Sequence, residues 1–380
     1  MTKRNILLFT AVPGLLCFLA CARPATKAND HGTTKTTNGN DTTNTAVNAN
    51  VYTDTARAIQ PAIITEHVQF DSDDPAIWVN RANPAQSLVI GTDKSADGAL
   101  YVFDLQGKIK QVVRGLQRPN NVDIAYGLLL NGKRVDYAVT SERITHKLRF
   151  FSLPDMQPID DGGIPIFEGE TGKQYRDLMG IAVYTSKSGQ QYAIAGRKTG
   201  PQDGTYLWQY LLSDNGAGKV KATLVRKFGH YSGKKEIEAI AVDNEAGYIY
   251  YSDEQYGVRQ YYADPEKGNE ELSLFGATGF TEDHEGISIY KTSPKKGYLL
   301  VSDQGANKFH IFSREGTTHA LLKVVKVSAS HSDGSDIVNI PLNETFRHGL
   351  FVVMSDDRTF HYYRWEDIAG KQLESAPTKK

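Results

Sequence analysis

Short apolar runs alternate with polar, turn-forming residues along most of the chain, from about residue 58 to its C-terminal end. Six of these runs share one pattern, in which the apolar stretch ends in a small residue and charged or amide side chains follow it. Their first residues are 49, 55, 56, 50 and 52 positions apart. The six runs are Leu88–Lys94, Tyr137–Arg143, Tyr192–Lys198, Tyr248–Glu254, Tyr298–Gln304 and Leu350–Asp356.

Each run has a further apolar segment before it and another after it, as Ala76–Val79 and Leu100–Phe103 do for the first run. Short strands that are bounded by turn residues and repeat near every fifty positions are typical of a β-propeller. No segment between them has the length and periodicity of a helical layer. We therefore predict an all-β fold, a six-bladed β-propeller of four-stranded antiparallel blades, over residues 58–372. Residues 59–70 are expected to close the ring, which leaves no long unpaired sheet edge.

The first 21 residues have the pattern of an export signal. Lys3 and Arg4 precede an apolar stretch over residues 6–20, and small residues lead up to Cys21. The stretch is too short and too interrupted to span a membrane. A cysteine directly after the cleavage point resembles the lipobox of bacterial lipoproteins. We predict an exported lipoprotein of the cell envelope whose only membrane contact is this anchor, and secretion without a lipid stays open as the alternative.

Residues 22–57 are rich in Thr and Asn and carry few large apolar side chains. Such a composition does not repay the entropy of ordering, so we predict a disordered tether. The two cysteines of the chain, Cys17 and Cys21, both lie in the leader. The folded part therefore has no disulfide framework and no cysteine nucleophile.

The charges balance almost completely, with 43 Lys and Arg against 44 Asp and Glu. A nucleic-acid partner is therefore not expected. The arrangement is more informative, because acidic residues recur where the strand before each run begins, and charged or amide residues recur where the run ends. In an antiparallel pair these two ends are adjacent, so all of them are predicted on one rim of the ring. The acidic residues before the runs are Asp71, Asp73, Asp74, Asp123, Asp177, Glu236, Glu238, Asp283, Glu285, Asp333 and Asp336.

So many carboxylates at the mouth of one channel repel each other unless cations neutralise them. Calcium is the natural cation, because it accepts six to eight oxygen ligands in irregular geometry. Four basic residues, Lys94, Arg143, Arg197 and Lys198, stand among the acidic ones. A site that offers both bound cations and Lys or Arg donors suits a polyanionic substrate, above all phosphate.

The segment Asp71–Trp78 resembles the D-x-D-D-P-A-I-W segment of the β-propeller phytases. The likeness continues, in order, over roughly residues 60–370, through Asn120–Ile124, Leu130–Asp136, Asp283–Gly286, Ser302–Gly305, Gly349–Val352 and Trp365–Glu366. This resemblance implies a six-bladed hydrolase of the 3-phytase type that uses several Ca²⁺ ions. Its implied reaction is the release of phosphate from phytate, myo-inositol hexakisphosphate, by direct attack of a calcium-activated water.

The resemblance also assigns roles to residues of this chain. Glu238 matches the glutamate associated with the attacking water, and Lys94, Arg143 and Arg197 match donors that bind and stabilise phosphate. The implied calcium ligands are Asp73, Asp74, Asp253, Glu254, Asp283, Glu285, Gln304, Asp333 and Asp356.

Two residues depart from the family pattern. Met179 stands where a phosphate-holding Tyr is usual, and Lys198 stands where a Glu is common. Lys198 is expected to replace a calcium ligand by a fixed positive charge that contacts substrate.

The expected protein is therefore a monomeric calcium-dependent phosphomonoester hydrolase with phytate as its small-molecule substrate. Two alternatives remain at this point. One is a calcium-dependent lactonase or phosphotriesterase on a six-bladed ring, which needs fewer basic residues than Lys94, Arg143 and Arg197 provide. The other is a surface-anchored propeller that binds a ligand without catalysis.

Overall fold

The computed structural model describes residues 51–377. The chain divides into two units at residues 47 and 48, and every described residue belongs to the second unit. The predicted signal segment and residues 22–50 of the predicted tether lie outside the described residues. No helix of the described part is long and apolar enough to cross a membrane.

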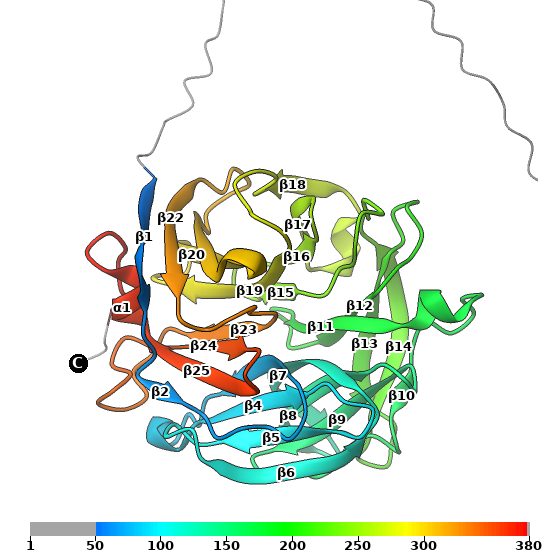
Figure 1. The fold of residues 1–380 in the computed structure, drawn as a ribbon. Coiled ribbons are helices and arrows are strands. Elements are labelled where there is room, and N and C mark those ends of the chain that lie inside the picture. The colour runs from blue at the N-terminus through cyan, green and yellow to red at the C-terminus, as the bar shows by residue number, and fades with distance from the viewer. Residues whose placement is uncertain (1–50, 378–380) are drawn as a thin grey trace, which may run out of the picture. The chain divides into compact units, whose positions relative to one another are not determined.

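Six sheets radiate around a common centre and form the six predicted blades (Figure 1). The strands of blade 1 are β3 (Ser72–Trp78), β4 (Leu88–Asp93), β5 (Gly98–Phe103) and β6 (Ile109–Leu116). Blade 2 consists of β7 (Pro119–Leu130), β8 (Lys133–Glu142), β9 (Lys147–Leu153) and β10 (Ile164–Pro165). Blade 3 consists of β11 (Leu178–Thr185), β12 (Gln191–Arg197), β13 (Leu207–Asp214) and β14 (Val220–Phe228).

The second half of the ring repeats this order. Blade 4 consists of β15 (Ile240–Asp243), β16 (Tyr248–Asp253), β17 (Gly257–Tyr262) and β18 (Glu271–Phe275). Blade 5 contains β19 (His284–Lys291), β20 (Gly297–Asp303), β21 (Lys308–Ser313), β22 (Leu321–Val327) and the early strand β1 (Tyr52–Ile59). Blade 6 contains β23 (Ser335–Val338), β24 (Leu350–Ser355), β25 (Thr359–Arg364) and the early strand β2 (Ile63–Ile64).

Helical structure is confined to short segments. The one α-helix among residues 51–377 is α1 (Trp365–Ala369). The 3₁₀ turns are η1 (Pro84–Gln86), η2 (Lys173–Arg176), η3 (Pro265–Lys267) and η4 (Gln304–Ala306). The all-β prediction and the six blades of four antiparallel strands are therefore confirmed, and β1 adds a fifth, parallel strand to blade 5.

The ring is closed by strand β2. Ile63 pairs with Tyr362 and Ile64 with His361, so a strand from the start of the domain becomes the outermost strand of the last blade. This confirms the prediction that residues 59–70 close the ring. Blade 6 is thereby covered on its outer edge by backbone hydrogen bonds between two distant parts of the chain.

The domain begins earlier than its apolar pattern indicates. Strand β1 starts at Tyr52, inside the predicted tether, and pairs in parallel with β22 through Tyr52 and Lys323. Main-chain pairing needs no apolar side chains, so composition gave no signal for this strand. At the other end, the indole of Trp365 stacks on Tyr290 at 3.7 Å and the backbone of Ala376 donates to the Tyr290 hydroxyl, which extends the ordered chain past residue 372.

The first two strands of each blade bring the predicted rim residues together. Ser72 pairs with Asp93 in blade 1, Pro119 with Glu142 in blade 2, and His284 with Asp303 in blade 5. The beginning of each inner strand therefore lies beside the end of its neighbour, as the antiparallel argument requires.

Close packing between the inner strands also fixes the site. Gly180 in β11 leaves no room for a side chain, because a Cβ there would overlap the carbonyl oxygen of Glu238 in the neighbouring blade. Aliphatic and aromatic residues fill the remaining space between adjacent blades, as Leu178, Ile181 and Trp208 do between blades 2 and 3. These clusters hold the loops of the rim on a rigid base.

Candidate active site

Two overlapping groups of carboxylates lie on the rim of blades 4 and 5. Possible ligand atoms of Glu236, Glu238 and Glu254 lie within 4.8 Å of one another, and so do those of Glu254, Asp283 and Glu285. Glu254 follows strand β16 directly, whereas the other four residues lie at or just before the beginnings of β15 and β19. Glu254 therefore joins the two groups into one acidic cluster of five residues.

A second set of residues meets at blades 1, 5 and 6. The ammonium of Lys94 contacts a carboxylate oxygen of Asp73 and lies 3.3 Å from Oδ2 of Asp333. The amide of Gln304 donates to the other oxygen of Asp333. Asp73 is fully buried. Burial opposes ionisation of Lys94, but the neighbouring carboxylates of Asp73, Glu238 and Asp333 outweigh it and raise the pKa of Lys94 above its ordinary value.

Arg143 reaches the acidic cluster through an amide. Its guanidinium forms a two-pronged pair with Asp177, at 3.0 and 2.9 Å, and donates to Oδ1 of Asn120 at 3.1 Å. The Asn120 amide donates in turn to Oε1 of Glu238 at 2.5 Å. Glu238 is therefore near Lys94, and hydrogen bonds through Asn120 link it to Arg143.

Burial makes these carboxylates hard to ionise together. Desolvation raises the pKa of Glu238, although Lys94 opposes the rise, and Asp333 and Glu236 add to it. Desolvation and the neighbouring Glu238 raise the pKa of Glu254 to about 9. The pKa of Glu285 is well above its ordinary value, first because of burial and then because of Glu254 and Glu238. A bound cation would lower all three pKa values.

The donor set fits a hard cation such as Ca²⁺. Within residues 51–377, Oδ2 of Asp73, Oε1 of Glu254 and Oε2 of Glu285 are buried and have no hydrogen-bond partner. Buried carboxylate oxygens without partners are costly unless a cation or a protein donor neutralises them. Oxygen atoms are also the ligands that calcium prefers. The predicted ligands Asp73, Glu254, Asp283, Glu285, Gln304 and Asp333 all lie in this region.

Three other predicted ligands have carboxylates that are bonded to other groups of the protein. Asp253 is fully buried, pairs with Arg259 at 2.8 Å and accepts hydrogen bonds from Ser232. Asp356 is half exposed and contacts Ser330 and His331 on the surface. Adjacent sequence positions on a strand end point to opposite faces, which separates Asp253 from its neighbour Glu254.

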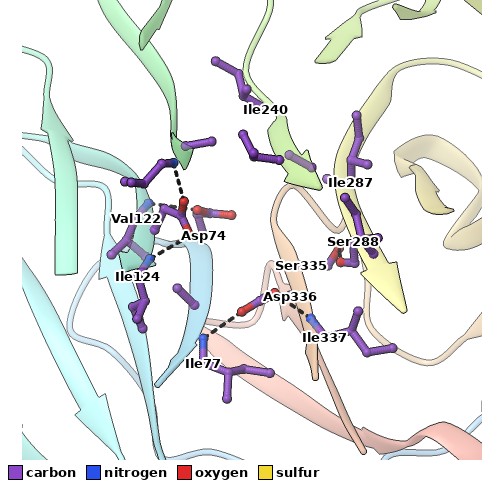
Figure 2. A pocket seen from close by; sticks show the side chains of 18 of the residues that line it. Asp74, Ile77, Val122, Ile124, Ile240, Ile287, Ser288, Ser335, Asp336 and Ile337 are labelled. Carbon is purple, nitrogen blue, oxygen red and sulfur yellow. Dashed lines mark hydrogen bonds between the residues drawn. The ribbon is translucent and has the colours of Figure 1, made fainter. Parts of the chain in front are cut away.

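Asp74, the third of these predicted ligands, lines the central channel. A cavity of about 270 Å³ there is lined mostly by aliphatic side chains of the inner strands. Figure 2 shows Asp74 beside Val122 and Asp336 beside Ile77 in this cavity. Asp74 accepts from the backbone of Val122, and Asp336 from that of Ile77, so each carboxylate links its own blade to the next.

Asp123 makes a third link of this kind, to the backbone of Val183 in blade 3. Burial raises the pKa of Asp123 to about 7 and that of Asp336 to about 6, although backbone hydrogen bonds oppose both shifts. The rim sequence predicted these residues at the channel but not their role in joining blades.

Arg197 does not face the acidic cluster. It is fully buried, and its guanidinium donates to the backbone carbonyls of Tyr206, Tyr175 and Thr205 at 3.0–3.1 Å. It also lies 3.4 Å from Glu170. Its donors are therefore used within blade 3 and its entrance loop, and its predicted contact with phosphate stays a prediction.

The two residues that depart from the family pattern differ in position. Lys198 is half exposed on the rim and pairs with Glu236 at 2.9 Å, so it adds a positive charge beside the acidic cluster. Met179 is buried, and its carbonyl accepts from the Ser141 hydroxyl at 2.6 Å. Met179 offers no polar side-chain group to a substrate.

A second, basic pocket of about 290 Å³ lies on the far side of Arg143. It is lined by Arg118, Lys173 and His146 together with Arg143 and its partner Asp177. Arg118 and Lys173 are exposed. This pocket offers positive charge next to the acidic cluster.

The sequence pattern indicated no role for Asn120, the residue that links Arg143 to Glu238. It also assigned none to Lys235, whose ammonium contacts Glu254 and Asp283. The sequence did contain a signal for each of them, because Asn120 and Lys235 stand directly beside predicted rim positions, in Asn120-Asn121 and Lys235-Glu236.

Comparison with known proteins gives three findings. The family model described as Phytase matches residues 8–370. The 3-phytase of Bacillus subtilis (strain 168) is 29% identical over 338 residues, which cover 80% of this chain and 84% of that protein. Among solved structures, the β-propeller domain of Cps50 (Swd1) from Myceliophteria thermophila has a TM-score of 0.45 at 10% identity, and the match covers 77% of this chain and 83% of that one.

Proposed function

This chain belongs to the phytase family, and from that premise we propose that it releases phosphate from phytate in a calcium-dependent reaction with no covalent enzyme intermediate. One observation carries the proposal. The buried carboxylate of Glu238 belongs to an acidic cluster suited to calcium, and both Lys94 and Arg143 lie close enough to interact with its charge.

Calcium ions bound by this cluster would neutralise the phosphate and make an attacking water more acidic. Asp73, Glu254, Asp283, Glu285, Gln304 and Asp333 are the residues proposed to hold them. The buried oxygens of Asp73, Glu254 and Glu285 that have no hydrogen-bond partner support this assignment.

Glu238 is proposed to orient the attacking water and to accept its proton. Burial raises the pKa of Glu238 and so makes it a better base than an exposed glutamate. The Asn120 amide fixes Oε1 of Glu238, which leaves Oε2 to face the water. Attack forms the new P–O bond as the bond to the inositol oxygen breaks. Glu238 takes the proton of the attacking water, and the inositol oxygen takes up a proton from solvent as it leaves.

Lys94 and Arg143 are proposed to bind the oxygens of the transferred phosphoryl group. Both are partly or largely buried, and both are held in place by carboxylates, Lys94 by Asp73 and Arg143 by Asp177. Donors that are fixed before the reaction stabilise the charge of the transition state without reorganisation.

The basic pocket beside Arg143 supports phytate as the preferred substrate over a simple monoester. Phytate carries a phosphate on every ring carbon, so a neighbouring phosphate can enter the pocket of Arg118, His146 and Lys173 while the first is attacked. Arg143 lies between the two positions and can contact both phosphates. This second contact increases affinity and orients the ring.

Phosphate release from phytate, measured with added Ca²⁺ and with excess EDTA, tests the proposal. The expected result is release that EDTA abolishes and Ca²⁺ restores. Full activity in excess EDTA would overturn the calcium requirement. Absence of release under both conditions, with hydrolysis of a lactone or a phosphotriester instead, would support the rival propeller hydrolase.

We also propose that the protein is exported and anchored through a lipid on Cys21. The charged start, the apolar stretch and the cysteine after small residues support this reading. A surface-anchored phytase would act on substrate outside the cytoplasm.

A further inference from the structure

Lys235 places a positive charge inside the acidic cluster. Its Nζ lies 2.9 Å from Oε2 of Glu254 and contacts Oδ2 of Asp283. The Tyr231 hydroxyl donates to the carbonyl of Lys235, which fixes the backbone from which the side chain extends. The Lys235 side chain is 35% exposed, so it approaches the cluster from the solvent side.

The two carboxylates that Lys235 contacts are also two of the three that form one candidate metal group. Glu254, Asp283 and Glu285 have ligand atoms within 4.8 Å of one another. Asp283 is otherwise bonded by the amide of Gln255, at 2.9 Å from Oδ1. In the described part of the chain, Oε2 of the nearly buried Glu285 has no donor at all.

A single ammonium cannot neutralise this group. It carries one positive charge against three carboxylates, and its contacts reach two of them. Burial and the neighbouring carboxylates keep the pKa of Glu285 well above its ordinary value even with Lys235 in place. A divalent cation would contribute twice the charge and would contact oxygens at about 2.3–2.6 Å.

An ammonium and a calcium ion cannot share the same oxygens, since two cations within a few ångströms repel strongly in a partly buried site. We infer that Lys235 is a resident counter-ion that competes with calcium for Glu254 and Asp283 and thereby sets the calcium concentration at which this part of the site fills. The inference rests on the proposed calcium requirement of the enzyme.

Lys235 is therefore expected to stabilise the calcium-depleted fold and to weaken calcium binding. Without calcium, Lys235 stabilises the folded protein, because it offsets the repulsion among buried carboxylates. With calcium, Lys235 opposes binding, because its ion pairs must break before the metal takes the oxygens. Replacing Lys235 should therefore destabilise the calcium-depleted protein and strengthen calcium binding at the same time.

The test is calorimetric titration of the calcium-depleted full chain with CaCl₂ for the parent, Lys235→Met and Lys234→Met. Lys234 is the matched control, because it is exposed and its Nζ donates to the carbonyl of Gln255 at 3.0 Å rather than to a carboxylate. We expect Lys235→Met to bind calcium at one site about fivefold more tightly, as for the loss of a partly exposed ion pair. Lys234→Met should bind as the parent does.

Melting temperatures from circular dichroism provide the second readout. Lys235→Met should melt below the parent in EDTA and should gain more than the parent from added calcium. Equal or weaker calcium binding by Lys235→Met would overturn the inference. Lys235→Gln, which keeps a polar side chain, provides the same comparison if the methionine variant does not fold.

A double-mutant cycle with Glu254→Gln locates the effect. If Lys235 competes for Glu254, Lys235→Met should strengthen calcium binding more in the parent than in the Glu254→Gln background, where only the competition for Asp283 remains. An equal gain in both backgrounds would contradict competition at this carboxylate. Because binding is measured without substrate, the outcome is independent of phytate hydrolysis, and a failure of either proposal can be recognised separately.

Discussion

The side-chain amide of Asn120, in blade 2, donates a hydrogen bond to Oε1 of Glu238, which precedes the first strand of blade 4. The same amide accepts from Arg143 on its oxygen. One neutral side chain therefore holds both Glu238, the proposed base, and Arg143, which is proposed to donate hydrogen bonds to phosphate.

Asn120→Ala should lower kcat for phytate by roughly ten- to a hundredfold, the effect of removing a hydrogen bond to a charged group. KM should change less than kcat, because Asn120 does not bind the substrate and Asp177 still holds Arg143 after the substitution. Steady-state kinetics measure both constants. Asn215→Ala, an exposed amide on the turn between β13 and β14, is the control, and an equal loss in that variant would mean that Asn120 has no particular positioning role.

Glu238→Gln should retain the fold and lose turnover by about a hundredfold or more, because the amide cannot accept a proton from water. It should also remove one negative charge from the buried cluster. We therefore expect the calcium-depleted variant to melt above the parent at pH 8. Phosphate release at the parent rate would show that Glu238 is not the base.

The pH dependence of folding stability should become weaker when calcium is bound. Burial raises the pKa of Glu254 from 4.5 to about 9, so the folded calcium-depleted protein binds a proton that the unfolded chain releases. The stabilisation that comes from this bound proton is complete below pH 4.5 and is lost as the pH rises through 9. Melting temperatures in EDTA should therefore fall over this range, and saturating calcium should reduce the fall; a pH-independent melting temperature in EDTA would contradict the raised pKa.

Lys173→Ala should raise KM for phytate several-fold while leaving the hydrolysis of a simple aryl phosphate unchanged. Lys173 lines the basic pocket, which only a second phosphate can reach. Loss of one phosphate contact by an exposed lysine corresponds to roughly 1 kcal/mol or less, about fivefold. Lys187→Ala, on the exposed turn between β11 and β12, should change neither substrate. Equal effects on both substrates would place Lys173 outside phytate recognition.

Cys21→Ala should release the protein from the membrane fraction without changing its specific activity. The proposed lipid anchor requires the thiol of this cysteine, whereas residues 51–377 contain no cysteine. Cell fractionation and incorporation of labelled palmitate measure the change. Parent protein that carries no label and remains soluble would favour secretion without a lipid.

The sequence was sufficient to predict the blades and the rim, because both depend on local rules that repeat. Apolar strands of similar length recur near every fifty residues, and antiparallel pairing places their ends together. The acidic cluster of Glu238, Glu254, Asp283 and Glu285 followed from those two rules and lies where they require.

Side-chain direction was not predictable in the same way. Arg197 and Asp253 lie at the expected strand ends, yet both are turned into their blades, where backbone carbonyls bind one and Arg259 binds the other. A strand end fixes the position of a residue but not which of several nearby partners its side chain selects. Asn120 and Lys235 escaped notice for a related reason, since each has a partner in another blade, Glu238 and Asp283 respectively, that only the closed ring brings near.

The parallel strand β1 has a mechanical consequence. Any pull on the chain before Tyr52 acts first on the pairing of β1 with β22, which runs through Tyr52, Thr53 and Asp54. Because the force runs along the strands, these hydrogen bonds must be sheared together rather than opened one by one. The short closing strand β2, held by two residue pairs, is thereby shielded from tension. A propeller held at its N-terminal end would therefore keep its ring closed under forces that would otherwise separate β2 from β25.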